Sequence, residues 1–200
     1  MKASDYFRPE TSALLLIDHQ VGTMQLIKNL PLAQVRRHTL ALAKLARLLA
    51  MPVVLTSSQE DRFQGSLMPE LAELLPDEYA ARIKRQGIAN AWDDPAFVEA
   101  VRATGRTDLV MAGVTTDVCM VFPAISALDE GFRVQVVLDA GGSPFEMSEQ
   151  MAQQRMAAAG VVLTTTITAF AELVGDWTRG DGKPQALLFE DVLGPVLAPR

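Results

Sequence analysis

The chain has 200 residues, which predicts one domain with room for a tail, because most domains hold roughly 100–150 residues. Hydrophobic residues make up 49% and charged residues 21%, as in globular domains and unlike disordered or fibrous chains. A single cysteine excludes a disulfide framework and multi-cysteine metal sites. The net charge of −6 disfavours nucleic acid and anionic membranes as partners. With no apolar run long enough for a signal peptide or a membrane span, we expect a cytoplasmic protein.

Hydrophobic periodicity alternates along the chain between two types of segment. Short apolar runs predict strands over 12–18, 52–57, 79–85, 107–113, 132–139 and 161–165. Helical spacing, first-turn prolines and terminal glycines predict helices over 32–49, 69–75, 95–103, 117–130, 146–159 and 168–177. In the helix over 146–159, we expect Met147, Met151 and Met156 to belong to the core.

Six apolar strands that alternate with helices indicate a parallel sheet covered on both faces. The predicted fold class is therefore α/β, a three-layer doubly wound (Rossmann-like) domain with a six-stranded parallel sheet over residues 1–177. Residues 178–200 form a tail, in which a polar stretch with glycine and proline precedes an apolar segment. We expect this tail to pack on the domain or on a neighbouring subunit, and we prefer the neighbour.

Ligands of open parallel sheets bind outside the carboxyl ends of the strands. The polar residues expected at those ends are Asp18, His19, Gln20, Ser57, Ser58, Glu60, Lys84, Arg85, Thr115, Thr116, Asp117, Cys119 and Asp139. They are the candidates for a functional site.

Cys119 is the most specific of these candidates. It follows the fourth strand by a short turn, so it lies in the first turn of a helix that Thr116 or Asp117 caps. The helix dipole stabilises a thiolate there, and Asp18 and Lys84 can supply the base and the cation that complete an activated nucleophile. Position alone is equally compatible with a buried structural cysteine.

The two histidines do not extend this site. His38 lies in a basic helical stretch and is expected at the surface. His19 follows Asp18 on a strand, so the two side chains should point to opposite faces, which disfavours a Cys–His dyad. Without clustered ligands there is no metal site, and the absence of glycine-rich phosphate loops predicts no nucleotide cofactor.

Several segments carry a resemblance to a known family. LLLIDHQ, KRQGIANAWDDPAF, GVTTDVC and VVLDAGG resemble the isochorismatase-like cysteine hydrolases of the YcaC-type subgroup, from about Ala13 to Trp177. The specific features are an acid that ends strand one, a lysine that ends strand three, and a cysteine that opens a helix.

The resemblance implies a catalytic triad. Asp18 would be the general base, Lys84 would keep Asp18 ionised and oriented, and Cys119 would attack an amide-like carbonyl to form a thioester. The amide of Cys119 and the amides near Val114 and Thr115 would form the oxyanion hole, and a cis peptide bond would join Val114 to Thr115.

The resemblance also implies two weaker substrate-binding candidates, Asn90 and Trp92, near the mouth of the pocket. Family members assemble, so a homo-oligomer is expected. Nicotinamidases carry histidine metal ligands after strand two, but this chain has TSSQEDRFQGS there. We therefore predict no metal and no cofactor, and we disfavour nicotinamide as the substrate.

The leading hypothesis is a metal-independent cysteine hydrolase that cleaves a carbon–nitrogen bond of a small molecule, an amidase in the broad sense. One alternative is an isochorismatase-type ether hydrolase, in which Cys119 would be dispensable. The other is a non-catalytic oligomeric binding or scaffold protein on the same fold.

Overall fold

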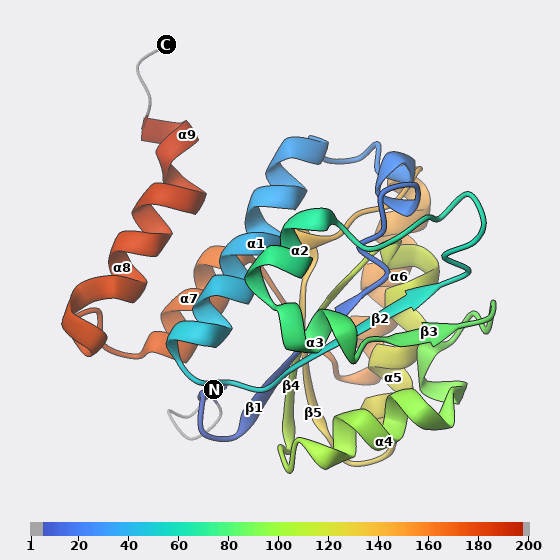
Figure 1. Cartoon of the computed structure of the whole chain (residues 1–200), viewed down its shortest axis with the longest axis horizontal. Coiled ribbons are helices and arrows are strands. Elements are labelled where there is room, and N and C mark those ends of the chain that lie inside the picture. Colours follow the sequence, from blue (N-terminus) through green and yellow to red (C-terminus); the bar gives the residue numbers. More distant parts are fainter. Residues whose placement is uncertain (1–5, 198–200) are drawn as a thin grey trace.

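A six-stranded sheet forms the centre of the structure, a computed structural model that describes residues 6–197 (Figure 1). All its strand pairs are parallel, and the strand order is β3-β2-β1-β4-β5-β6. The strands are β1 (Ser12–Ile17), β2 (Val53–Ser58), β3 (Ile83–Arg85), β4 (Asp108–Gly113), β5 (Arg133–Val137) and β6 (Val162–Thr164). This arrangement confirms the predicted doubly wound α/β class.

The apolar runs form strands because both faces of the sheet are buried. In β1, Leu14 and Leu16 belong to one hydrophobic cluster, and Leu15 and Ile17 belong to the cluster on the opposite face. The third predicted strand was too long. Residues 76–80 form a short helix, and only Ile83–Arg85 pair with β2.

Helices cover both faces of the sheet (Figure 1). One layer contains α1 (Leu32–Leu48), α2 (Pro69–Leu74) and α7 (Thr166–Val174), and the other contains α4 (Pro95–Ala103), α5 (Val121–Asp129) and α6 (Glu146–Ala159). Shorter segments are η2 (Thr23–Leu26), α3 (Pro76–Ala80), η3 (Ala91–Asp93), η4 (Thr116–Met120) and η5 (Leu138–Ala140). No helix within residues 6–197 is long and apolar enough to cross a membrane.

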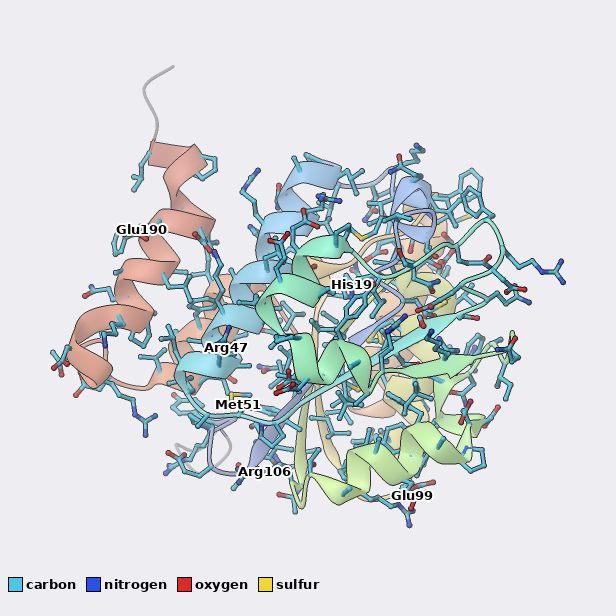
Figure 2. All side chains as sticks on the ribbon, viewed as in Figure 1. His19, Arg47, Met51, Glu99, Arg106 and Glu190 are labelled. Atoms are coloured by element: carbon cyan, nitrogen blue, oxygen red, sulfur yellow. The ribbon has the colours of Figure 1, made fainter. Side chains whose placement is uncertain are left out.

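Two predictions about individual side chains were wrong. His38 is buried, with 6% of its surface exposed, because its Nδ1 lies 3.0 Å from the Asp139 carboxylate. Met156 is in the core as expected, but Met147 and Met151 are exposed on the outer face of α6. His19 is buried near the middle of the molecule (Figure 2), with its Nε2 2.8 Å from the Ala140 carbonyl oxygen.

The tail folds into a helical arm that runs along α1 (Figure 1). After η6 (Arg179–Gly182), the arm consists of α8 (Lys183–Leu187), η7 (Leu188–Leu193) and α9 (Gly194–Leu197). Leu188 and Val192 are buried in the core cluster that contains α1, and Lys44 binds Asp191 at 2.6 Å. Glu190 lies on the outer side (Figure 2). This part of the tail therefore packs on its own domain.

Two neighbouring residues of the arm provide a test of this docking. Leu188→Asp places a charge in the buried contact with α1 and should detach the arm, because an unpaired buried charge is strongly destabilising. Detachment should raise the rate of tryptic cleavage after Arg179 by at least about tenfold. Phe189→Asp, at a position that is 46% exposed, is the matched control and should leave this rate unchanged. Equal cleavage of the two variants would contradict the docking.

Candidate active site

Asp18 lies at the carboxyl end of β1, in the middle of the sheet. The chain leaves the strand there through a left-handed backbone conformation, with φ of 57°, which aspartate tolerates better than β-branched residues do. The amide of Asp18 still donates to the Thr56 carbonyl oxygen on β2 at 3.0 Å. The carboxylate is only 1% exposed, so it needs a partner.

Arg85 is that partner. Its Nη2 contacts both carboxylate oxygens of Asp18, and the arginine side chain is as deeply buried as the aspartate. Two further bonds orient the guanidinium, from Nε to Thr56 Oγ1 at 3.1 Å and from Nη1 to the Ile88 carbonyl oxygen at 2.7 Å. Burial raises the pKa of Asp18, and the charge and hydrogen bonds of Arg85 oppose that rise.

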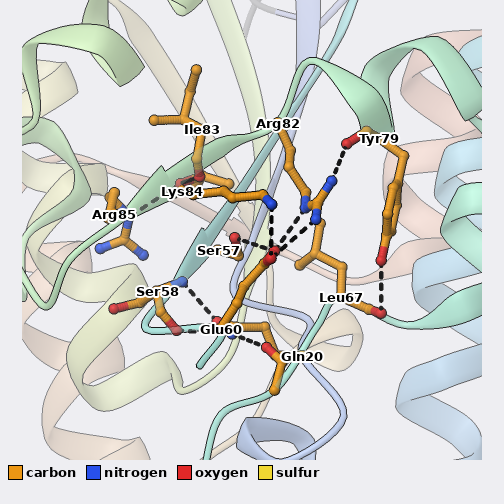
Figure 3. A network of polar contacts seen from close by, with 12 residues as sticks. Gln20, Ser57, Ser58, Glu60, Leu67, Tyr79, Arg82, Ile83, Lys84 and Arg85 are labelled. Atoms are coloured by element: carbon orange, nitrogen blue, oxygen red, sulfur yellow. Dashed lines mark hydrogen bonds and ion pairs between the residues drawn. The ribbon is translucent and has the colours of Figure 1, made fainter. Parts of the chain in front are cut away.

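The resemblance implies that Lys84 orients Asp18, but in the structure Arg85 makes the ion pair with Asp18. Lys84 and Arg85 are consecutive on β3, so their side chains point to opposite faces of the sheet. The Lys84 side chain is 54% exposed, and its Nζ lies 3.3 Å from Glu60 (Figure 3).

Glu60 is the centre of this second polar cluster (Figure 3). Its carboxylate also accepts hydrogen bonds from Arg82 at 2.7 and 3.0 Å and from Ser57 at 2.7 Å. The bond from Arg82 is the main cause that lowers the pKa of Glu60 to about 2. Lys84 thus belongs to a solvent-facing network that holds the end of β2 against β3.

Cys119 faces Asp18 from the other side of the site. It lies on η4, which joins the turn after β4 to α5 and has the i→i+5 hydrogen bonding of a π-helix, and its side chain is partly buried. The N-cap is Thr115, without a side-chain capping bond, so the capping predicted for Thr116 or Asp117 was wrong. The turn places the thiol near the Asp18 carboxylate, so that each group affects the pKa of the other.

The sequence analysis expected a stabilised thiolate at Cys119, but the surroundings of the sulfur favour the protonated thiol. Burial, followed by the negative charge of Asp18 and the hydrogen bond to it, raises the pKa of Cys119 to about 12. The Thr115 amide and Arg85 act in the opposite direction, but they do not outweigh these causes. At neutral pH the site therefore pairs a protonated thiol with an aspartate that can accept its proton.

The backbone around Cys119 limits the amides that can bind an oxyanion. A cis peptide bond joins Val114 to Thr115, as the resemblance implies. The Val114 amide already donates to the Ile17 carbonyl oxygen at 3.0 Å, whereas the Thr115 amide faces the sulfur of Cys119. Of the amides near the cis bond, the one from Thr115 is thus placed next to the reacting atom.

Asn90 and Trp92 have structural contacts. The side chain of Asn90 caps η3 by accepting from the Trp92 amide at 3.1 Å, and it donates to Ser126 at 3.1 Å. The Trp92 ring is buried and makes edge contacts with Phe97 and Phe132. The structure therefore places Trp92 in the core rather than at a pocket mouth.

A hollow of about 670 Å³ lies between η4, α5 and α6, and Asp18, Arg85 and Cys119 are not among its lining residues. Its walls include Asp117 and Val121, which stand on either side of Cys119 in the sequence, and residues of α6. Within residues 6–197, no three His, Cys, Asp or Glu side chains cluster as metal ligands would. The chemistry that the site offers is therefore a thiol, a carboxylate base and a buried cation that orients it.

Comparison with known proteins places this chain in a family. The model of the isochorismatase domain matches residues 12–168, a span that contains Asp18, Arg85 and Cys119. The protein called probable hydrolase YcaC from Escherichia coli is 42% identical over 180 residues, which cover 90% of this chain and 85% of that protein.

Two solved structures extend the likeness to three dimensions. YcaC from Pseudomonas aeruginosa, with hexane-2,5-diol and covalent acrylamide, has a TM-score of 0.91 at 39% identity and covers 96% of this chain and 94% of its own. The YcaC gene product of Escherichia coli, described as an octameric hydrolase of unknown specificity, has a TM-score of 0.91 at 40% identity, with 98% and 94% covered. The chain therefore belongs to the isochorismatase-like hydrolases, among their YcaC-type members.

Proposed function

We propose that this chain is a metal-independent cysteine hydrolase that cleaves a carbon–nitrogen bond in a small amide. The observation that carries the proposal is the partly buried Cys119 beside the buried Asp18–Arg85 ion pair. A nucleophile beside a base that is itself oriented by a third group is the general arrangement for covalent catalysis.

The reaction proceeds in two halves. As the sulfur of Cys119 attacks the carbonyl carbon, Asp18 takes the thiol proton and the Thr115 amide stabilises the oxyanion. Asp18 then gives this proton to the leaving nitrogen, the carbon–nitrogen bond breaks, and a thioester remains. Water then attacks the thioester while Asp18 takes a proton from the water. The carbon–sulfur bond breaks, Asp18 returns that proton to the sulfur of Cys119, and the carboxylic acid is released.

The raised pKa of Cys119 fits general-base catalysis better than a preformed thiolate. A thiol with a pKa of about 12 is a weak nucleophile until its proton leaves. The adjacent carboxylate removes that proton only during attack, which also limits reaction with unrelated electrophiles. Arg85 acts through Asp18, so it is a positioning residue.

Two properties of relatives support the proposal. The Pseudomonas aeruginosa structure contains covalent acrylamide, an electrophile that thiols attack and that carries a primary amide. The Escherichia coli structure is octameric, and we propose that this chain also forms a homo-oligomer.

The first prediction concerns the nucleophile. In a panel of small primary amides, Cys119→Ala should lower the rate of ammonia release by at least about a thousandfold, because covalent catalysis is lost. Circular dichroism should show an unchanged fold. Undiminished hydrolysis by Cys119→Ala would refute the proposal and favour an ether-hydrolase type of reaction. Absence of any turnover in the wild type would favour a binding or scaffold protein.

The second prediction concerns the base and uses acrylamide as the probe, with the mass shift of Cys119 as the readout. In the wild type, the modification rate should be flat above the pKa of Asp18, because the ionised carboxylate accepts the proton. In Asp18→Asn, the base is gone and the pKa of Cys119 falls, since the neighbouring negative charge is removed. The rate should then rise about tenfold per pH unit below that pKa. A steep wild-type profile would contradict the role of Asp18.

The third prediction separates Arg85 from Lys84. Arg85 opposes the rise in the pKa of Asp18, so Arg85→Gln should move the acidic limb of the acrylamide profile to higher pH. Arg85→Lys keeps the charge but loses the bonds to Thr56 and Ile88, and it should give an intermediate profile if the Gln variant is too unstable to purify. Lys84→Gln is the matched control and should keep the wild-type profile. If Lys84→Gln shifted the pH profile and the Arg85 variants did not, Lys84 would be the residue that orients Asp18, as the resemblance implies.

A further inference from the structure

The side chain of Gln20 is buried two residues after Asp18, and its carboxamide is satisfied at both ends. Its Oε1 accepts from the Ser58 amide at 2.8 Å, and its Nε2 donates to the Ser58 carbonyl oxygen at 2.8 Å (Figure 3). The same nitrogen donates to the Gly65 carbonyl oxygen. Such a buried amide holds its partners in place, because displacement would leave unpaired polar atoms in the interior.

The two bonds to Ser58 replace backbone contacts that β1 does not make. In a regular parallel ladder, the Ser58 amide would donate to the Asp18 carbonyl oxygen, since the Asp18 amide donates to Thr56 at 3.0 Å. The left-handed backbone of Asp18, with φ of 57°, turns the chain out of the strand. Its carbonyl oxygen accepts from the Gln20 amide at 2.7 Å instead. The carboxamide of Gln20 thus takes the place of the β1 backbone beside the last residue of β2.

The opposite edge of β2 faces Arg85. The two strands β2 and β3 are paired in register up to this arginine, and the Gln59 amide donates to the Arg85 carbonyl oxygen at 2.9 Å. Gln59 also packs against Gly87, where an added Cβ would lie 2.6 Å from the Gln59 Nε2. The next residue, Ile88, supplies the carbonyl oxygen that binds the Arg85 guanidinium. The end of β2 therefore connects Gln20 on one side to Arg85 on the other.

We propose that Gln20 is a positioning residue for the Asp18–Arg85 pair and acts through the end of β2. The left-handed turn at Asp18 removes the backbone bonds that would otherwise keep this end of β2 in the sheet. Gln20 restores these bonds with its side chain, so β2 and β3 stay in register as far as the arginine that orients the base. This inference deepens the proposed function and rests on it.

The test measures the base rather than product formation. It uses acrylamide as the probe and the mass shift of Cys119 against pH as the readout. Arg85 and Cys119 are the titratable groups that act on the pKa of Asp18, and both lower it. Gln20→Met keeps the length of the side chain without its hydrogen bonds, so Arg85 should lose its orientation. The acidic limb of the profile should then move to higher pH by about half a unit, a roughly threefold lower rate on that limb.

Further variants separate positioning from a general loss of stability. Gln25→Met, at an exposed glutamine of η2, is the matched control and should keep the wild-type profile. Combined with Arg85→Gln, the Gln20→Met substitution should add no further shift, because Gln20 acts through Arg85. If Gln20→Met is too unstable to purify, Gln20→Asn, which keeps the amide on a side chain one methylene shorter, should give a smaller shift in the same direction.

Each outcome decides the inference. A lower melting temperature with an unmoved acidic limb would show that Gln20 only stabilises the fold, and would overturn its positioning role while the proposed function stands. Shifts from Gln20→Met and Arg85→Gln that add up in the double variant would overturn the route through Arg85. A wild type without an acidic limb would overturn the role of Asp18 as the base, and with it both the proposed function and this inference.

Discussion

The ion pair between Asp18 and Arg85 is the constraint on which the site depends. Removing two charges from water costs several kcal/mol per ion, and the structure offsets this cost by satisfying the guanidinium from several directions. Thr56 on β2 and the Ile88 carbonyl after β3 each accept one of its hydrogen bonds. The pair therefore requires β1, β2 and β3 to be in register, which ties the chemistry of the site to the sheet.

The same pair explains why the thiol stays protonated. If Arg85 faced Cys119 directly, its charge would stabilise a thiolate. Instead the guanidinium is bound to Asp18, and the negative charge of Asp18 outweighs that of Arg85 in its effect on the pKa of Cys119. The positive charge keeps the base available, and the negative charge keeps the nucleophile protonated until a substrate arrives. Our sequence interpretation of Cys119 included Asp18 as the base, but it expected the helix dipole to stabilise a thiolate, because the burial of the thiol and its distance from the carboxylate are set by the fold.

The fold was predictable from the sequence because buried parallel strands are continuous apolar runs with helices between them. The runs around Leu14 and Val110 are of this kind, and their positions were predicted to within a residue or two. The positions of Asp18 and Cys119 in one site were also predictable, since the carboxyl ends of parallel strands meet at one edge of the sheet. The role of Arg85 as the partner of Asp18 was not predictable. Lys84 and Arg85 are adjacent, and a shift of one residue in the strand moves every side chain to the other face.

Side-chain exposure was the least predictable property. His38 lies in a basic stretch typical of a surface helix, yet Asp139, a hundred residues away in the chain, draws it into the interior. Burial disfavours the ionised form of Asp139, but hydrogen bonds from His38 and Thr166 outweigh this and lower its pKa. Contacts between residues so far apart in the chain leave no periodic pattern in the sequence.

Helix α6 has two sides with different surroundings. Its inner side carries Glu149 and Met156, which are buried, and Glu149 fixes the turn before Cys119 through Ser143. Its outer side carries exposed methionines with glutamine and arginine side chains between them, so α6 packs on the domain along one side only. The position of Cys119 therefore depends on the buried side of α6, because Glu149 holds Ser143 and, through it, the beginning of η4.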